Sequence, residues 1–280
     1  MATNDDDVRS PYPAAARLLS SSLSEFTFVS DNTKGHFDAS FSLLAHAGAA
    51  FRAGRACVLI TCYGDAAHWR AALRRLLGAE DAAAIAVVNL CELFPKKIIS
   101  SETFSEMSTA MMRARALIDG ALAAAATENA SYLYVSSTVA SSSSSASASA
   151  LASAPTSSWI GIDDIFGIVD AWGLAFGSAT ILALPAAAAE KSVYLTARAA
   201  PGINWSVDTG AGDLLGVGLR AAVEDAATGT IFVETLVMAG ERGAQGRLRW
   251  SRKKGGPGGV AVSEEALFRV AIDGRVVDGV

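Results

Sequence analysis

The chain has 280 residues, of which 18% are charged and 51% hydrophobic, and its formal net charge is −5 at pH 7. This acidic balance excludes a globally basic nucleic-acid coat protein, and the apolar content excludes a chain that is disordered throughout. Because 56 of the residues are Ala, much of the apolar content comes from a small side chain rather than from Leu, Ile and Phe.

The first 24 residues are polar and rich in Ser, Ala and Pro, so we expect a flexible N-terminal segment. After it, apolar runs of strand length alternate with segments of helical spacing. We expect strands over residues 25–30, 55–62 and 85–90, and helices over residues 37–53, 65–77 and 102–127. This alternation predicts an α/β domain with a mostly parallel central sheet flanked by helices.

Residues 136–158 are almost entirely Ser and Ala, and we interpret them as a disordered insertion, because such a segment buries too little apolar surface to order itself. Strand patterns resume directly afterwards, so residues 25–280 are predicted to form one domain. The expected later strands cover residues 159–162, 193–196, 230–236, 246–251, 268–272 and 275–277. Gly-rich turns separate the last four, which predicts antiparallel C-terminal strands.

A stretch of 19 residues, 171–189, carries no charge and approaches the length that spans a bilayer. Gly173, Gly177 and Pro185 interrupt it, and most of the remainder is Ala, Ser and Thr. We therefore expect a buried helix or loop and no membrane association.

The turn after the first expected strand has the position and length of a phosphate-binding P-loop, G-x-x-x-x-G-K-[ST]. Ser30 replaces the first glycine, and Gly35 keeps the second. His36 stands where the phosphate-binding lysine belongs, and Phe37 cannot hold magnesium as a hydroxyl does. Lys34 could reach a phosphate but is more simply a solvated loop residue. The loop therefore has the geometry of a nucleotide site without its chemistry.

A second feature that resembles part of a nucleotide site is the apolar run 159–162. It is followed directly by Asp163 and Asp164. An acid at the end of such a strand helps to hold magnesium in P-loop enzymes. The alternative is that one of the two aspartates caps the following helix. We favour capping, because a magnesium ligand has little use opposite Phe37.

One basic cluster stands out in this acidic chain: Arg247, Arg249, Arg252, Lys253 and Lys254. The two-residue period of a strand places Arg247 and Arg249 on one face, and the cluster then enters a Gly-rich loop. Arg249, Arg252, Lys253 and Lys254 are therefore our candidate contacts to a nucleic-acid backbone, with a solvated hairpin tip as the alternative.

Other catalytic patterns are missing from the sequence. It has no G-x-S-x-G motif, no CxxC pair, and only three Cys and three His residues. His46 and His68 fall in expected helices, where a structural role is the simpler reading. We expect no enzyme activity, cofactor or metal. The cysteine usage and the acidic N-terminus indicate a reducing compartment, the cytoplasm with the nucleus as a further possibility.

Together these parts resemble a RecA-like domain with a degenerate P-loop, and in particular the family of the sixth subunit of the Elongator complex. The blocks that carry the resemblance are DNTKGHF, RACVLITCYGDAAHWRAALRRLLG, VVNLCELF, WIGIDDIFGIV and LRWSRKKG. They span the chain from Phe26 to its C-terminus, apart from the Ser/Ala-rich insertion.

The resemblance implies a non-catalytic subunit of a hetero-hexameric ring, built from two copies each of Elongator subunits four, five and six. The ring docks on the catalytic Elongator subcomplex, binds tRNA and supports modification of the wobble uridine. Two other hypotheses stay open. The chain could be an active or vestigial P-loop ATPase of the RecA class, or an unrelated α/β binding module.

Overall fold

A computed structural model describes residues 14–33, 39–63, 66–93, 109–140, 157–199, 212–236, 244–253, 261–270 and 276–278. The strands are β1 (Phe26–Asn32), β2 (Ala56–Thr61), β3 (Ile85–Asn89), β4 (Ser158–Ile162), β5 (Val193–Ala199), β6 (Gly229–Thr235), β7 (Gly246–Lys253), β8 (Ala261–Val270) and β9 (Val276–Asp278). The helices are α1 (Ala14–Ser21), α2 (Ser40–Arg52), α3 (Ala66–Leu77), α4 (Ala79–Ala83), α5 (Leu90–Leu93), α8 (Ala110–Ala140), α9 (Gly167–Trp172), α10 (Leu174–Glu190) and α11 (Gly212–Ala226).

The described strands form one sheet in the order β3-β2-β4-β5-β1-β6-β7-β8-β9. Every pairing from β3 across to β6 is parallel, and the pairings from β6 to β9 are antiparallel. The expected fold class, a mostly parallel sheet with antiparallel C-terminal strands, is confirmed. The parallel strands all end at one edge of the sheet, which is where α/β proteins build ligand sites.

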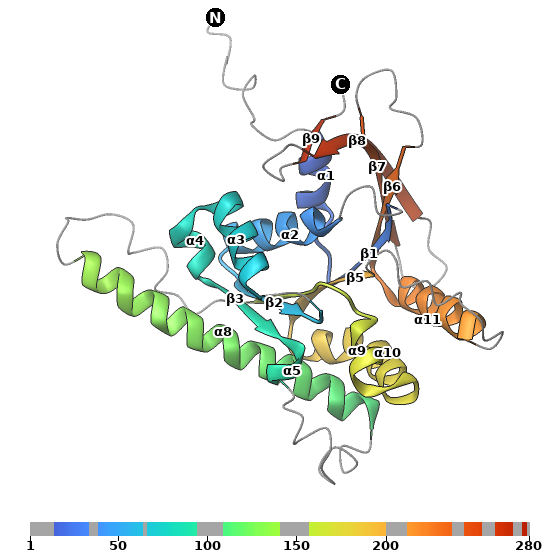
Figure 1. Cartoon of the computed structure of the whole chain (residues 1–280), viewed down its shortest axis with the longest axis horizontal. Coiled ribbons are helices and arrows are strands. Elements are labelled where there is room, and N and C mark those ends of the chain that lie inside the picture. Colours follow the sequence, from blue (N-terminus) through green and yellow to red (C-terminus); the bar gives the residue numbers. More distant parts are fainter. Residues whose placement is uncertain are drawn as a thin grey trace, which may run out of the picture.

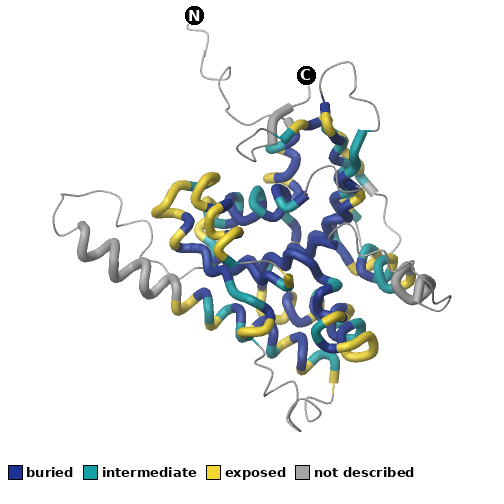
Figure 2. Tube along the Cα trace, viewed as in Figure 1, coloured by how far each residue is buried: buried dark blue, intermediate teal, exposed yellow. Residues whose placement is uncertain are grey.

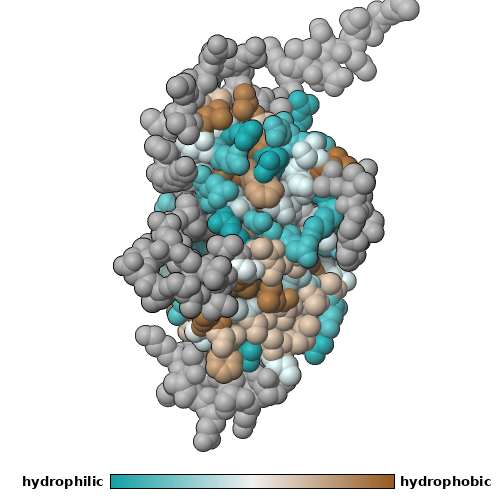
Figure 3. All heavy atoms as spheres, turned by 90° about the vertical axis from the view of Figure 1, so that its right-hand side faces the viewer, coloured by the Kyte–Doolittle hydropathy of each residue, from teal (hydrophilic) through white to brown (hydrophobic). Residues whose placement is uncertain are grey.

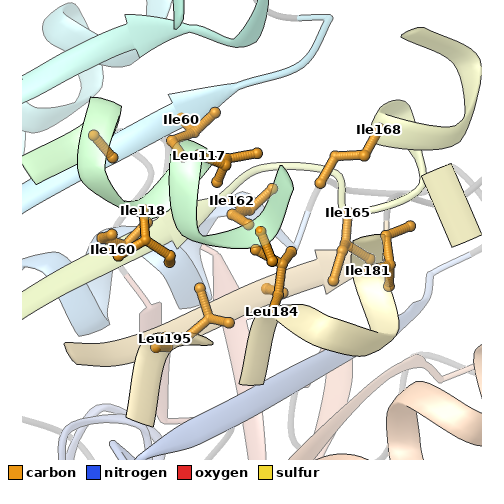
Figure 4. Packing of buried hydrophobic residues seen from close by; sticks show 14 of the residues in the cluster. Ile60, Leu117, Ile118, Ile160, Ile162, Ile165, Ile168, Ile181, Leu184 and Leu195 are labelled. Carbon is orange, nitrogen blue, oxygen red and sulfur yellow. The ribbon is translucent and has the colours of Figure 1, made fainter. Parts of the chain in front are cut away.

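Helices cover both faces of the parallel part of the sheet (Figure 1). On one face, apolar residues of β2, β4 and β5 pack against α8, α9 and α10, as Figure 4 shows for Ile60, Ile160 and Leu195. On the other face, α2, α3 and α4 cover β2, β3 and β4. Side chains that point to either face of the sheet are therefore buried. This explains the continuous apolar runs of the sequence and the buried strands in Figure 2.

The N-terminal segment differs from the flexible stretch expected over residues 1–24. Residues 14–21 form α1, and Leu18 and Leu19 are buried against β7 and β8 residues such as Leu248 and Phe268. Ala15, Leu18 and Leu19 pack the helix onto the antiparallel strands. Residues 1–13 lie outside the described residues.

The long helix also differs from its expected bounds of 102–127. It begins at Ala110 and continues to Ala140, into the segment interpreted as a Ser/Ala-rich insertion. Residues 141–156 of that segment lie outside the described residues, and β4 begins at Ser158.

The uncharged stretch 171–189 forms the end of α9 and most of α10, and only one side of α10 is buried. The side chains of Leu174, Phe176 and Leu182 are exposed. Figure 3 shows the side of the molecule that lies at the right of Figure 1. In the lower half of this view the surface is brown and tan, which marks hydrophobic residues. Among the described residues, no helix is long and apolar enough to span a bilayer. Part of the stretch expected to be a buried helix or loop is therefore an uncharged outer helix face.

Gly177 of α10 permits a close approach to α9. A Cβ added there would lie 2.5 Å from the Cα of Val169. We expect Gly177→Ala to lower the free energy of unfolding by about 1–3 kcal/mol through this overlap, measured by urea unfolding. The matched control is Gly218→Ala in α11, where a Cβ meets nothing within 4 Å. That variant should be neutral or more stable, because Ala favours a helix by about 1 kcal/mol over Gly. Equal losses in both variants would contradict the packing argument.

Candidate functional site

The candidate nucleotide site lies at the edge of the sheet where β1 ends. Ser30, which stands at the first P-loop position, is buried inside β1, and the strand continues to Asn32. The remaining loop positions, Lys34, Gly35, His36 and Phe37, lie outside the described residues.

Asp31 occupies the end of β1 and was not singled out by the sequence. One carboxylate oxygen accepts a hydrogen bond from the backbone N–H of Thr33 (3.0 Å), and the other accepts one from the N–H of Ala39 (3.2 Å). Ala39 is the N-cap of α2, so the carboxylate lies at the positive end of the helix dipole. In a P-loop protein, backbone N–H groups of this segment hold a phosphate. Here the chain's own carboxylate accepts from one N–H inside the loop-like stretch, that of Thr33, and from one just beyond it, that of Ala39.

Arg198, near the end of β5, completes a buried ion pair with Asp31. Its Nη1 lies 3.4 Å from a carboxylate oxygen of Asp31, and the two side chains are 8% and 0% exposed. Burial raises the pKa of Asp31, and the hydrogen bonds from Thr33 and the charge of Arg198 oppose that shift. The Nε of Arg198 also donates to the backbone carbonyl of Asp163 (2.8 Å). The pair thus ties the ends of β1, β4 and β5 together.

A second arginine, Arg220 of α11, contacts the end of β1. The guanidinium of Arg220 donates to the hydroxyl of Ser30 (2.6 Å) and approaches the side-chain oxygen of Asn32 (3.4 Å). The same side chain forms an ion pair with Glu224 one turn along the helix (3.6 Å). Ser30 therefore contributes a hydrogen-bond acceptor for a helix of the fold, which is a structural role.

Asp163 and Asp164 lie where the sequence placed them, directly after β4. The carboxylate of Asp163 accepts hydrogen bonds from the backbone N–H of Cys62 (2.7 Å) and from the indole of Trp69 (3.2 Å). Asp164 accepts a hydrogen bond from the N–H of Phe166 (3.1 Å), in the turn that leads into α9. The first aspartate fixes the end of β2, and the second shapes the turn before α9. The N-cap of α9 is Phe166, without a side-chain capping bond, so neither aspartate caps this helix as the alternative predicted. Among the described residues, no group of three or more metal-ligating side chains is assembled.

The cysteine beside this site is shielded from reaction. Burial raises the pKa of the Cys62 thiol well above its usual value, and the charges of Asp163 and Asp164 raise it further. A thiol that stays protonated is a poor nucleophile.

The basic cluster is in large part engaged with its own strands. The guanidinium of Arg247 forms an ion pair with Glu234 (2.5 Å), and that of Arg249 lies 4.6 Å from the ring centre of Phe232. The ammonium of Lys253 forms an ion pair with Asp225 (2.8 Å). Leu248 and Trp250 are buried on the opposite face of β7, so the predicted alternation is confirmed. Arg252 is exposed, and Lys254 lies outside the described residues.

Sequence reasoning missed Asp31, Arg198 and Arg220. An arginine within the apolar run VYLTARA was a usable signal, because a charge in a buried strand requires a partner. The identity of that partner was not readable, since Asp31 and Arg198 are 167 positions apart.

The fold and the site together define a class: an α/β domain with a mostly parallel sheet, in which a buried ion pair of the chain's own side chains joins the ends of β1 and β5. No protein-family model matches the chain, and no curated protein matches it. Among solved structures, the chain is similar to a KaiC-like protein from the hyperthermophilic archaeon Pyrococcus horikoshii. The two are 14% identical over 97% of each chain, with a TM-score of 0.46.

Proposed function

We propose that the chain is a non-catalytic, RecA-like subunit of a hetero-oligomeric ring rather than a nucleotide-hydrolysing enzyme. The observation that carries the proposal is the Asp31 carboxylate, which accepts hydrogen bonds from the N–H of Thr33 after β1 and from the N–H of Ala39 before α2. A buried carboxylate there would repel the phosphates of a nucleotide. It would also occupy backbone N–H donors that a phosphate would otherwise use. The sequence supports the same reading, because His36 and Phe37 replace the residues that would bind phosphate and magnesium.

The finer form of the proposal rests on the resemblance to the sixth subunit of the Elongator complex. The chain would then alternate with Elongator subunits four and five in a hetero-hexameric ring that docks on the catalytic subcomplex. The ring would bind tRNA, in the cytoplasm and also in the nucleus, and support modification of the wobble uridine. The exposed apolar residues of α10 favour an assembly, because an uncharged helix face on a chain's surface is typical of a protein–protein interface.

The experiment that tests assembly is native mass spectrometry of the tagged chain, purified gently from its own cells. We expect a six-membered complex with two copies each of three RecA-like chains. A lone monomer or a homo-oligomer would contradict the ring. The complex should also retain bound tRNA at low salt, because phosphate contacts weaken steeply as salt rises.

The non-catalytic part of the proposal is tested by calorimetric titration of the isolated chain with magnesium ATP. We expect a dissociation constant weaker than about 1 mM, which corresponds to less than about 4 kcal/mol of binding free energy. Binding in the micromolar range would instead favour a vestigial or active P-loop ATPase.

The outer face of α10 gives a prediction about assembly. We expect Leu182→Glu to release the chain from a ring neighbour, because it places a charge in an apolar contact. Leu76→Glu on α3 is the matched control, since the two leucines are 45% and 38% exposed. The measurement is co-purification with the sibling subunits, together with the unfolding midpoint of each variant. Equal retention of both variants in the ring would contradict a role for α10.

A further inference from the structure

The outer edge of β8 is largely unpaired in the described part of the sheet. β8 has 10 residues, and β9 pairs only with the last three of them, Phe268, Arg269 and Val270. Residues 261–267 pair with β7 on one side and with no described strand on the other. This stretch is longer than a common strand of about five or six residues, so it has room for one further strand. Figure 1 shows β8 at the top of the molecule, far from α10.

Main-chain hydrogen bonds show which backbone groups of β8 point outward. The carbonyl of Phe268 accepts from the N–H of Gln245 (2.8 Å), on the side of the strand that faces β7. Successive strand residues direct their backbone groups to opposite sides, so the even-numbered residues of β8 face β7. The register agrees, because Lys253 donates to Thr228 on the β6 side (3.2 Å) and lies opposite the odd-numbered Ala261. The odd-numbered residues of the unpaired stretch therefore direct N–H and C=O groups away from the sheet.

The side chains of this stretch are open to solvent. Ser263, Glu264, Glu265 and Leu267 are all exposed. Glu264 lies on the sheet face that α1 covers in part, and Glu265 and Leu267 lie on the other face. A strand added to this edge would therefore meet a carboxylate on each face and an apolar side chain on one.

Glu265 shares its face with two arginines of β7 that are engaged elsewhere. Arg249 is opposite Glu265 in register, but its guanidinium lies 4.6 Å from the ring centre of Phe232. Arg247 forms an ion pair with Glu234 (2.5 Å). Glu234 is the main cause of the raised pKa of Arg247, and the charge of Glu265 adds a smaller contribution. Within the described part of the chain, Glu265 forms no ion pair.

Glu264 also forms no ion pair with a described residue. It lies opposite Trp250 in register, and the exposed Arg252 of β7 and Arg17 of α1 are the cations of the elements on its face. The one cation of β8 itself, Arg269, lies in the part of the strand that β9 pairs. The unpaired stretch of β8 thus carries two negative charges and no positive one.

Like charges disfavour a second copy of this edge as the partner. Outward-facing residues must meet each other, so odd-numbered positions pair with odd-numbered ones. When Ser263 pairs with Glu265 of the second copy, Glu264 lies opposite the second copy's Glu264. A shift by two positions places Glu265 opposite itself or Glu264 diagonal to itself. Like charges at such positions are destabilising, and charged edge residues are a common protection against self-association.

We propose that the outer edge of β8 binds an extended basic segment of a partner protein, which adds one antiparallel strand to the sheet. The outward backbone groups of residues 261–267 would hold the segment by main-chain hydrogen bonds, and side chains would select it. Two consecutive Lys or Arg residues point to opposite faces of a strand, so they would meet Glu264 and Glu265 together.

The spacing of the strands decides which charges the added strand meets. Neighbouring strands lie about 5 Å apart, so the added cations would be about 5 Å from the β8 chain and about 10 Å from the β7 chain. Glu264 and Glu265 would therefore outweigh the more distant arginines, whose effect is screened over about 10 Å. This surface is separate from the α10 face and does not depend on membership of a ring.

The test is fluorescence anisotropy of a labelled peptide, Val-Thr-Lys-Lys-Thr-Val-Thr, titrated with the full-length chain at about 50 mM NaCl. Its two lysines would lie opposite Glu265 and Glu264. We expect a dissociation constant of about 100 µM or tighter. Glu264→Gln/Glu265→Gln should weaken binding about tenfold. The matched control, Glu80→Gln/Asp81→Asn, removes the same charge from exposed positions of α4 and should bind within about twofold.

Two methylated peptides separate strand addition from simple charge attraction. The N–H groups of the third and fifth peptide residues would donate to the carbonyls of Glu265 and Ser263, so N-methylation of both should abolish binding. N-methylation of the second and fourth residues removes N–H groups that point to solvent, and should change binding by less than about threefold.

Equal binding of the two methylated peptides would overturn the proposal, as would absence of binding at about 1 mM of the unmodified peptide. An equal loss in the α4 control would overturn it too, because binding would then follow net charge. Native mass spectrometry of the isolated chain tests the other occupant. A dimer that Ser263→Pro dissociates would assign the edge to a second copy, since proline removes an outward N–H without breaking a bond to β7.

Discussion

Replacing Asp31 with alanine is expected to lower the free energy of unfolding by about 3–5 kcal/mol, because it removes one partner of a buried ion pair. Arg198 would keep its charge in a largely buried position, without the carboxylate that lies 3.4 Å away. The N–H groups of Thr33 and Ala39 would lose their acceptor at the same time. The measurement is urea unfolding at pH 7, with the fluorescence of the buried tryptophans as the signal.

Two further variants separate charge from shape. Asp31→Asn keeps the size and one acceptor oxygen, so it should lose less stability than Asp31→Ala. Asp31→Ala/Arg198→Met removes both charges, and its loss should be smaller than the sum of the two single losses by about 1–3 kcal/mol. Additive losses would show that the two side chains act independently, and the ion pair would then not be what closes this edge.

The parallel core was predictable because its signals are local. Strands covered on both faces, such as β2 and β3, appear as continuous apolar runs, and each is followed by a helix pattern. The helix α1 was missed because two buried leucines in a polar segment form too short a pattern to recognise. Its burial depends on β7 and β8, which lie more than two hundred positions away in the chain.

The candidate site was predictable only in outline. The ends of β1 and β4 were recognised from the degenerate P-loop and from Asp163 and Asp164. The buried ion pair at the end of β1 could not be predicted, because Asp31 and Arg198 belong to strands that only the sheet order makes neighbours. The basic cluster shows the converse: its cations are adjacent in sequence, but partners on β6 and α11 engage several of them.

A buried histidine of α2 makes stability depend on pH. His46 is fully buried, with its Nε2 2.9 Å from the hydroxyl of Ser22 and its Nδ1 3.0 Å from the hydroxyl of Thr196. The Ser22 hydroxyl donates to the carbonyl of Leu19, and the Thr196 hydroxyl accepts from the indole of Trp159. This donor inventory assigns the proton to Nε2 and leaves Nδ1 as an acceptor from Thr196. A second ring proton would require the Thr196 hydroxyl to reverse.

Burial lowers the pKa of His46 from 6.5 to about 4. Above pH 6.5 the imidazole is neutral in both the folded and the unfolded chain, so it adds no pH dependence there. Between about pH 6.5 and 4 the unfolded chain binds a proton that the folded chain refuses, and stability falls as the pH falls. The loss should reach about 2 kcal/mol at pH 5 and about 3 kcal/mol below pH 4.

The measurement is urea unfolding at pH 7.5 and pH 5 for the unmodified chain and for His46→Gln. Glutamine keeps a donor and an acceptor but does not titrate, so carboxylates that titrate over the same range contribute equally to both proteins. The unmodified chain should therefore lose about 2 kcal/mol more than the variant between the two pH values. Equal losses would mean that His46 is protonated as readily in the folded chain as in the unfolded one. The hydrogen bonds that connect Trp159, Thr196, His46 and Ser22 would then not hold the imidazole ring neutral.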